Sequence, residues 1–126
     1  MSCCTALNLT SKYTETGLLM PMTPEAKVKK KVKEYLQSIG AWYYMPVSNG
    51  MGRVGCPDIL VCYSGHFLAF ETKAPGKIKN VTPNQLREIN GIQRANGLAH
   101  VVDDVAQVIA IMEKLDDQII KEGTGN

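Results

Sequence analysis

The sequence contains few cysteines, and none of them stands in a metal-binding arrangement. Cys3, Cys4, Cys56 and Cys62 are the only four, two of them are adjacent, and none forms a C-x-x-C pair. This spacing argues against a zinc site and against a disulfide framework. Reduced thiols in an intracellular protein fit the pattern best.

Long apolar runs are also missing. No segment approaches the ~20 apolar residues of a membrane-spanning helix, and residues 1–22 have neither the basic start nor the unbroken apolar stretch of a signal peptide. Residues 1–22 show no sustained helical or strand period either. We therefore expect a cytoplasmic protein with an N-terminal arm and no membrane partner.

A strong excess of one charge is absent as well. Fourteen Lys and Arg residues face twelve Asp and Glu residues, and the net charge of +2 is too small to indicate nucleic-acid binding by itself. The distribution is more informative, because five lysines fall within seven residues: Lys27, Lys29, Lys30, Lys31 and Lys33. This lysine stripe is either a solvated helix face or a surface that binds phosphates.

The length and the hydrophobic content predict one domain. A chain of 126 residues with 44% hydrophobic residues can bury a single core and has little room for a second. We place this domain at residues 23–120, between the arm at 1–22 and a C-terminal tail at 121–126.

Local signals predict seven elements in the order α, β, β, β, α, β, α. Thr23-Pro24 and Thr82-Pro83 mark two helix starts, and Gln85 completes a capping box with Thr82. The third helix follows Asp103 or Asp104. Strands are expected at 41–47, 59–63, 66–71 and 98–102. Because the last strand must return by a crossover, the fold class is α/β, a mixed β-sheet with flanking helices on both faces.

The two central strands are expected to form a β-hairpin. Their apolar runs flank Ser64-Gly65, a two-residue turn signal. Pairing outward from this turn, without a bulge, places Asp58 directly opposite Glu71.

The residues at the open end of this hairpin suit phosphodiester chemistry. Two carboxylates, Asp58 and Glu71, can hold a hard cation such as Mg²⁺ or Mn²⁺, and the backbone carbonyl of Thr72 is a further candidate ligand. Strand alternation places Lys73 on the face of Glu71 and points the Thr72 side chain away. Lys73 would orient or deprotonate the attacking water, or stabilise the pentavalent phosphate. The constellation predicts a metal-dependent site that hydrolyses phosphodiester bonds.

A loop with three glycines, residues 48–55, precedes Asp58. The glycines either serve the turns of an ordinary connector or let the backbone approach a phosphate. We expect the planar guanidinium of Arg53 to bind phosphate. Further candidate DNA-binding residues are basic side chains of the loop after Lys73 and of the lysine stripe: Lys77, Lys79, Lys27, Lys30 and Lys31.

These motifs resemble a known group of enzymes. Gly55-Cys56-Pro57-Asp58, then Glu71-Thr72-Lys73, then a capped helix with Gln85, is similar to the PD-(D/E)XK nuclease superfamily and, within it, to the VRR-NUC family in its stand-alone, virus- or phage-type form. The resemblance covers about residues 25–112. It implies a restriction-endonuclease-like fold and a DNA endonuclease activity.

The resemblance also implies roles for two helical residues. Glu25 would lie near the metal as a catalytic residue and candidate ligand, and Gln85 would position phosphate or the catalytic lysine. Alternatively, each residue could act only in stabilising the start of its own helix. The resemblance further implies a homodimer that cuts branched DNA such as Holliday junctions, in the host cytoplasm if the protein is viral.

Two alternatives to a nuclease remain open at this point. A non-catalytic DNA-binding module would use the lysine stripe and Arg53, and would bind DNA in a salt-sensitive way without cutting it. A cysteine hydrolase would need a histidine beside Cys56 or Cys62, and no motif places one there.

Overall fold

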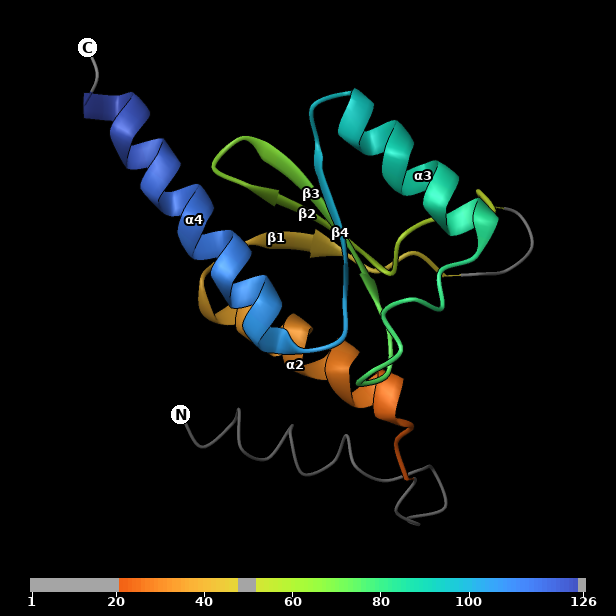
Figure 1. The fold of residues 1–126 in the computed structure, drawn as a ribbon. Coiled ribbons are helices and arrows are strands. Elements are labelled where there is room, and N and C mark those ends of the chain that lie inside the picture. The colour runs from red at the N-terminus through yellow and green to blue at the C-terminus, as the bar shows by residue number, and fades with distance from the viewer. Residues whose placement is uncertain (1–20, 48–51, 125–126) are drawn as a thin grey trace.

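The computed structural model describes residues 21–47 and 52–124. Its elements confirm the predicted order and the α/β class. Along the chain they are α2 (Pro24–Ser38), β1 (Trp42–Tyr44), β2 (Ile59–Tyr63), β3 (His66–Thr72), α3 (Pro83–Arg94), β4 (Leu98–Val102) and α4 (Val105–Thr124) (Figure 1). Residues 1–20 of the predicted arm and residues 48–51 of the glycine-containing loop lie outside the described residues.

The four strands form one mixed sheet in the order β1-β2-β3-β4. The first two pairings are antiparallel, and β3 pairs with β4 in parallel, so α3 lies in the expected crossover. Ser64 and Gly65 have φ values of 50° and 80°, the left-handed conformations that a two-residue primed turn requires. Tyr63 pairs with His66, which confirms the predicted register of the hairpin.

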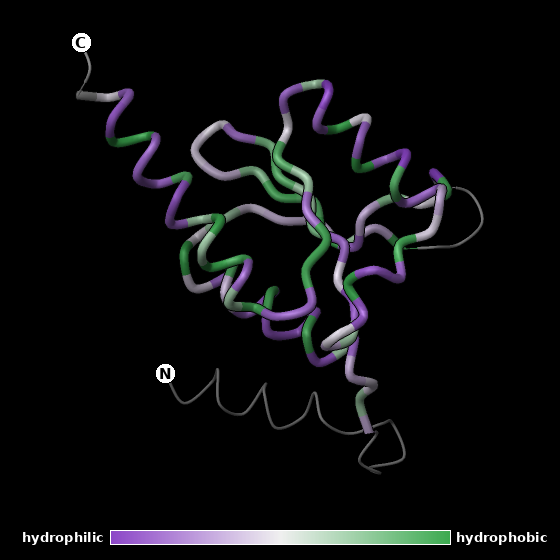
Figure 2. The backbone as a smooth tube through the Cα atoms, viewed as in Figure 1, coloured by the Kyte–Doolittle hydropathy of each residue, from purple (hydrophilic) through white to green (hydrophobic). Residues whose placement is uncertain are grey.

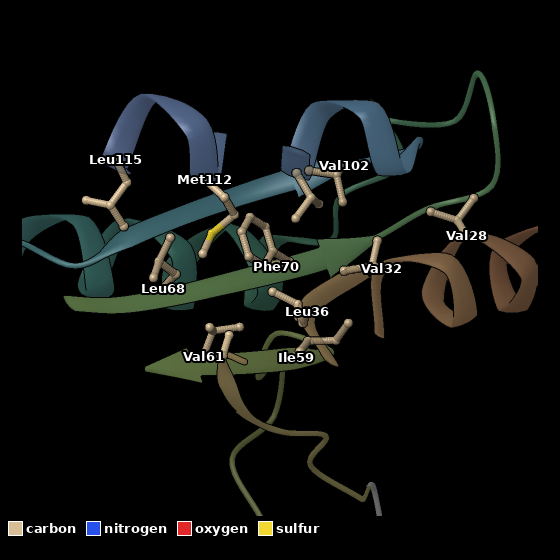
Figure 3. Close-up of a cluster of buried hydrophobic side chains, with 12 residues drawn as sticks. Val28, Val32, Leu36, Ile59, Val61, Leu68, Phe70, Val102, Met112 and Leu115 are labelled. Atoms are coloured by element: carbon tan, nitrogen blue, oxygen red, sulfur yellow. The ribbon is translucent and has the colours of Figure 1, made fainter. Parts of the chain in front are cut away.

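Helices cover both faces of the sheet, with α2 and α4 on one side and α3 on the other (Figure 1). The larger core lies between the sheet and the α2–α4 pair (Figure 3). Buried apolar side chains from both helices and from β2, β3 and β4 form this core: Val28, Val32, Leu36, Ile59, Val61, Leu68, Phe70, Val102, Val108, Met112 and Leu115.

A smaller core lies on the opposite face, under α3. Ala69 of β3 and Ala99 of β4 pack against Ile89 of α3. Alanine has a short side chain, so the helix can lie close to these two strands. Alternation along β3 therefore sends Leu68 and Phe70 to the larger core and Ala69 to the face that α3 covers.

The helix starts follow the predicted capping signals. Thr23 Oγ1 accepts a hydrogen bond from Ala26 N at 3.1 Å, Thr82 forms the full capping box, and Asp104 Oδ1 accepts from Ala106 N at 2.8 Å. Hydrophilic and hydrophobic residues alternate along α4, as an amphipathic helix requires (Figure 2). No helix in the described part of the chain is long and apolar enough to cross a membrane.

Three boundaries differ from the sequence expectation. The smallest difference is that β3 ends at Thr72, one residue after the expected end at 71. The first strand was expected at 41–47, but β1 covers only Trp42–Tyr44. β1 is an edge strand, and Pro46 has no N–H for the ladder, so pairing ends before it. Helix α4 continues to Thr124, past residue 120, where the domain was expected to end.

Replacing Phe70 by alanine should be strongly destabilising, because its side chain is 0% exposed at the centre of the larger core. We expect a loss of about 3–5 kcal/mol in the free energy of unfolding, measured by urea denaturation. Phe67→Ala on the same strand, at a side chain that is 45% exposed, is the matched control and should cost less than about 1.5 kcal/mol. Equal losses for the two variants would contradict this account of the core.

Candidate active site

The predicted site residues meet at the end of the β2–β3 hairpin that lies opposite its turn. A cavity of about 730 Å³ opens there. Its lining comes from β1 and the residues after it, the loop before β2, the two hairpin strands and the start of α3: Tyr44, Pro46, Val47, Gly52, Arg53, Val54, Gly55, Cys56, Pro57, Asp58, Leu60, Glu71 and Gln85.

Asp58 stands immediately before β2 and is held by the last residue of β3. Its Oδ2 accepts hydrogen bonds from the Thr72 backbone N at 3.0 Å and from Thr72 Oγ1 at 2.8 Å. The expectation that the Thr72 side chain points away from the site residues was therefore wrong. The last hairpin pair is Ile59 with Phe70, so Asp58 lies beyond the ladder, and strand alternation does not fix the direction of its side chain.

Glu71 is a buried carboxyl with one unsatisfied oxygen. Only 3% of the residue is exposed. Its Oε2 accepts a hydrogen bond from Gln85 Nε2 at 3.2 Å, but Oε1 is buried without a hydrogen-bond partner among the described residues. Burial, and then the negative charge of Asp58, raises the pKa of Glu71 from 4.5 to about 8, although the positive charge of Lys73 opposes this shift.

Gln85 connects Lys73, the buried acid Glu71 and the helix start. Its Oε1 accepts from Lys73 Nζ at 3.0 Å and from Thr82 N at 3.0 Å, while its Nε2 binds Glu71. Lys73 Nζ also lies 3.7 Å from Glu71 Oε2. The side-chain amide of Gln85 therefore caps the helix and contacts Lys73 and Glu71 at the same time, so its two expected roles are compatible.

Helix α2 brings two charged residues toward the acids. The negative charge of Glu25, in its first turn, contributes to raising the pKa of Glu71. One turn later, Lys29 Nζ lies 3.5 Å from Asp58 Oδ1. Lys29 belongs to the lysine stripe and is not among the site residues expected from the sequence. One sequence signal for Lys29 as a site residue was available. It stands four residues after the candidate Glu25, and residues at this spacing lie on the same helix face.

The loop before Asp58 is clamped to the start of α3. Arg53 binds Glu88 through Nε at 2.7 Å and Nη2 at 3.2 Å, and Arg87 Nη2 donates to the Val54 carbonyl at 3.1 Å. Gly55 has a φ of +84°, and a Cβ placed on it would lie 2.5 Å from backbone atoms of Asn84. This glycine therefore serves close packing of the loop against the helix. The guanidinium of Arg53 lines the cavity, but in this structure its partner is Glu88.

The other basic candidates do not line this cavity. Lys27 and Lys31 line a separate cavity of about 200 Å³, beside Asp103 and Asp104. The remaining three are not held against the acids: Lys30 is half-buried on α2, and Lys77 and Lys79 are exposed in the loop before α3. A role of these lysines in DNA binding stays a prediction.

Cys56 lines the site cavity but does not suit a nucleophile. Burial raises the pKa of its thiol, so the reactive thiolate is depleted at neutral pH. Cys62 is an exposed free thiol. These features argue against the cysteine-hydrolase alternative.

The acids fit a divalent cation with oxygen ligands. Within residues 21–47 and 52–124, no group of three or more His, Cys, Asp or Glu side chains is arranged to hold a metal ion. Magnesium sites, however, commonly use one or two carboxylates and complete the shell with water and substrate phosphate. The unpartnered Oε1 of Glu71 beside the charge of Asp58 is the arrangement that such a cation would satisfy.

A solved structure described as a VRR_NUC domain is similar to this chain. The two share 28% sequence identity with a TM-score of 0.57, and the alignment covers 73% of this chain and 97% of that one. No protein-family model matches the sequence, and a search among curated proteins finds no significant match. The structural match confirms the mixed sheet with flanking helices as a restriction-endonuclease-like fold and suggests a nuclease domain.

Gly55→Ala should push the loop before Asp58 away from the start of α3 and destabilise the protein. The added Cβ would clash with the backbone at the start of α3. The alanine would also have to adopt a left-handed backbone conformation. We expect a loss of at least ~2 kcal/mol in the free energy of unfolding, measured by urea denaturation. Gly40→Ala is the matched control, because Gly40 has a φ of +72° with nothing within 4 Å of a Cβ, and should cost only ~1 kcal/mol. If both variants lose the same amount, the close packing of the loop on α3 is not important.

The raised pKa of Glu71 predicts how stability depends on pH in the metal-free protein. The unfolded chain releases this proton near pH 4.5 and the folded protein near pH 8, so the free energy of unfolding falls as the pH rises through this range. Glu71→Gln removes the ionisable group. When the pH rises from about 5 to about 9, the parent should therefore lose more free energy of unfolding than this variant, by about 1 kcal/mol or more.

This pH effect is measured by urea denaturation in EDTA. Glu34→Gln, at an exposed carboxyl on α2, is the control and should follow the parent at both pH values. A parent and a Glu71→Gln variant with parallel pH profiles would show that Glu71 titrates normally.

Proposed function

We propose that this chain is a divalent-metal-dependent DNA endonuclease that hydrolyses phosphodiester bonds. The observation that supports it best is the buried oxygen of Glu71 beside Asp58, which has no hydrogen-bond partner among residues 21–47 and 52–124, with Lys73 held next to it by Gln85. A purely structural carboxyl at this depth would be expected to have both oxygens paired. The similarity to a VRR_NUC domain supports the same reading.

The metal would be Mg²⁺ or Mn²⁺, held by Asp58 and Glu71, with the Thr72 carbonyl and Glu25 as further candidate ligands. When bound, it would supply Lewis-acid activation of the phosphoryl oxygens and of the attacking water. Thr72 would keep Asp58 in place through its two hydrogen bonds. Lys29 Nζ lies 3.5 Å from Oδ1 of Asp58, the oxygen that does not accept from Thr72, and it would neutralise this carboxylate before the metal enters.

Lys73 would act on the substrate from a fixed position. Only 8% of the residue is exposed, and its ammonium donates to Gln85 Oε1. A buried and oriented ammonium can stabilise the charge that develops on the phosphate or position the water, without reorganisation during the reaction. Gln85 would keep Lys73 in that orientation while its amide N–H donates to Glu71.

The substrate and the assembly are further parts of the proposal. Following the resemblance in sequence, we propose a stand-alone, virus-type VRR-NUC nuclease that acts inside the cell, or in the host cytoplasm, on branched DNA such as Holliday junctions. We also propose a homodimer, because a two-fold dimer presents two sites to two strands. A protein that is monomeric by light scattering and still resolves four-way junctions by paired cuts would contradict the dimer.

Asp58→Asn and Glu71→Gln should each lower cleavage at least ~100-fold, because a lost metal ligand costs several kcal/mol of transition-state stabilisation. The assay incubates linear duplex, flap and four-way-junction DNA with each variant, with Mg²⁺, Mn²⁺ or EDTA, and follows products on denaturing gels. Asp117→Asn and Glu34→Gln, at exposed acids on α4 and α2, are matched controls and should cut like the parent.

Two outcomes would contradict the proposal. If the Asp58 and Glu71 variants cut in Mn²⁺ as fast as the parent, these acids are not the site. If the parent binds DNA in a salt-sensitive way but cuts no substrate with either metal, the chain is a binding module.

A further inference from the structure

The sheet face that carries Glu71 is only partly covered by α3. The helix packs over β3 and β4 through Ile89, Ala69 and Ala99. The register places Trp42 beside Cys62 and Tyr44 beside Leu60, on that same face. The half of the face formed by β1 and β2 therefore has no helix over it in the described part of the chain.

This uncovered half carries exposed aromatic rings. Trp42 is 63% exposed and Tyr44 is 53% exposed. Phe67 of the neighbouring strand β3, next to Cys62 in the register, is 45% exposed. By contrast, Tyr43 between the first two points to the opposite face and packs against the larger core. Trp42 is also the only tryptophan in the chain. Large aromatic side chains grouped in this way on a protein surface usually mark a binding site.

The aromatic surface is continuous with the candidate active site. Tyr44 and Leu60 line the same cavity as Asp58 and Glu71. Asp58 comes two residues before Leu60, and two residues of extended chain span roughly 7 Å. A molecule whose phosphate lies at the acids can therefore reach Tyr44, and Trp42 lies two residues before Tyr44 on the same strand.

We propose that Trp42 and Tyr44 form a stacking platform for an unpaired nucleobase next to the phosphate that is cut. The proposal rests on the proposed nuclease function and defines its substrate more closely. Bases inside a continuous duplex are stacked on their neighbours and cannot reach the rings, whereas an unpaired nucleotide at a flap, gap or opened junction can. Base–aromatic stacking contributes about 1–3 kcal/mol per base.

The position of the rings favours a nucleic-acid base over a second copy of the chain. A protein partner seated on Tyr44 would also cover the mouth of the cavity that contains the acids. The exposed guanidinium side of Arg53, on the same cavity, supplies positive charge for the adjoining phosphates. An aromatic platform beside a cation is the combination found in single-strand binding sites.

The fluorescence of Trp42 tests the platform without any need for cleavage. In EDTA, a single-stranded oligonucleotide should quench this fluorescence, and a fully paired, blunt-ended duplex should quench it much less. An oligonucleotide of abasic nucleotides, which keeps the phosphates and lacks the bases, should leave it unchanged. Equal quenching by the abasic strand or by the duplex overturns the proposal, as does a fluorescence change that follows protein concentration alone, which would indicate an interface between copies.

Substitutions then test the link to the substrate. Trp42→Ala and Tyr44→Ala should each weaken binding to flap DNA, with roughly a 5- to 150-fold rise in Kd or KM, and leave kcat and duplex binding near the parent values. Trp42→Phe should recover most of the loss, whereas Trp42→Leu, which keeps an apolar side chain without a ring, should not. Ile120→Ala on α4, also at a 63% exposed apolar side chain, is the control.

Equal losses on flap and duplex DNA, or full activity of Trp42→Leu, would overturn the platform. If the parent cuts no DNA at all, the proposed function fails, but the quenching experiment still decides on the platform. If the parent cuts DNA and the abasic strand quenches as well as the normal strand, the platform alone fails.

Discussion

The antiparallel pairing of β2 with β3 is the constraint on which the rest of the structure depends. A shift of this register by one residue would exchange the two faces of a strand. Leu68 and Phe70 would then leave the larger core, and Glu71 would leave the face of α3. The primed turn at Ser64-Gly65 prevents the shift, because both residues adopt left-handed conformations that fit only a two-residue connection. Core packing and site geometry are therefore determined by the same hairpin.

The site contains an unfavourable electrostatic arrangement, and the rest of the fold has to offset its free-energy cost. Burying the Glu71 carboxyl beside Asp58 costs free energy, because desolvation and like charge both disfavour the ionised form. Contacts with Gln85 and Lys73 offset part of this cost. The contacts of Arg53 with Glu88 and of Arg87 with Val54 connect the residues before Asp58 to α3. A cation between the carboxylates would relieve the conflict, which is why the arrangement suits a metal-dependent enzyme.

Most of the fold and the centre of the site could be predicted from the sequence because their signals are local. The caps at Thr23 and Thr82 and the two-residue turn depend on neighbouring residues only, and the turn then sets the register that brings Asp58 near Glu71. The contacts that were missed depend on tertiary structure. Thr72 bonds to Asp58 beyond the end of the ladder, where alternation no longer applies. The pairing of Lys29 with Asp58 requires the packing of α2 on the sheet, which no local pattern specifies.

The placement of α3 links the chemistry to the surface beside it. Gln85 can reach Glu71 and Lys73 only if the first turn of α3 lies over the end of β3. The small side chains of Ala69 and Ala99 seat the helix over β3 and β4, so one short helix cannot also cover β1. The same packing that brings the amide to the acids thus leaves the β1 side of that face without a helix over it in the described part of the chain. Polar residues would be the ordinary choice for such a surface, so the exposed rings of Trp42 and Tyr44 in their place favour a binding surface.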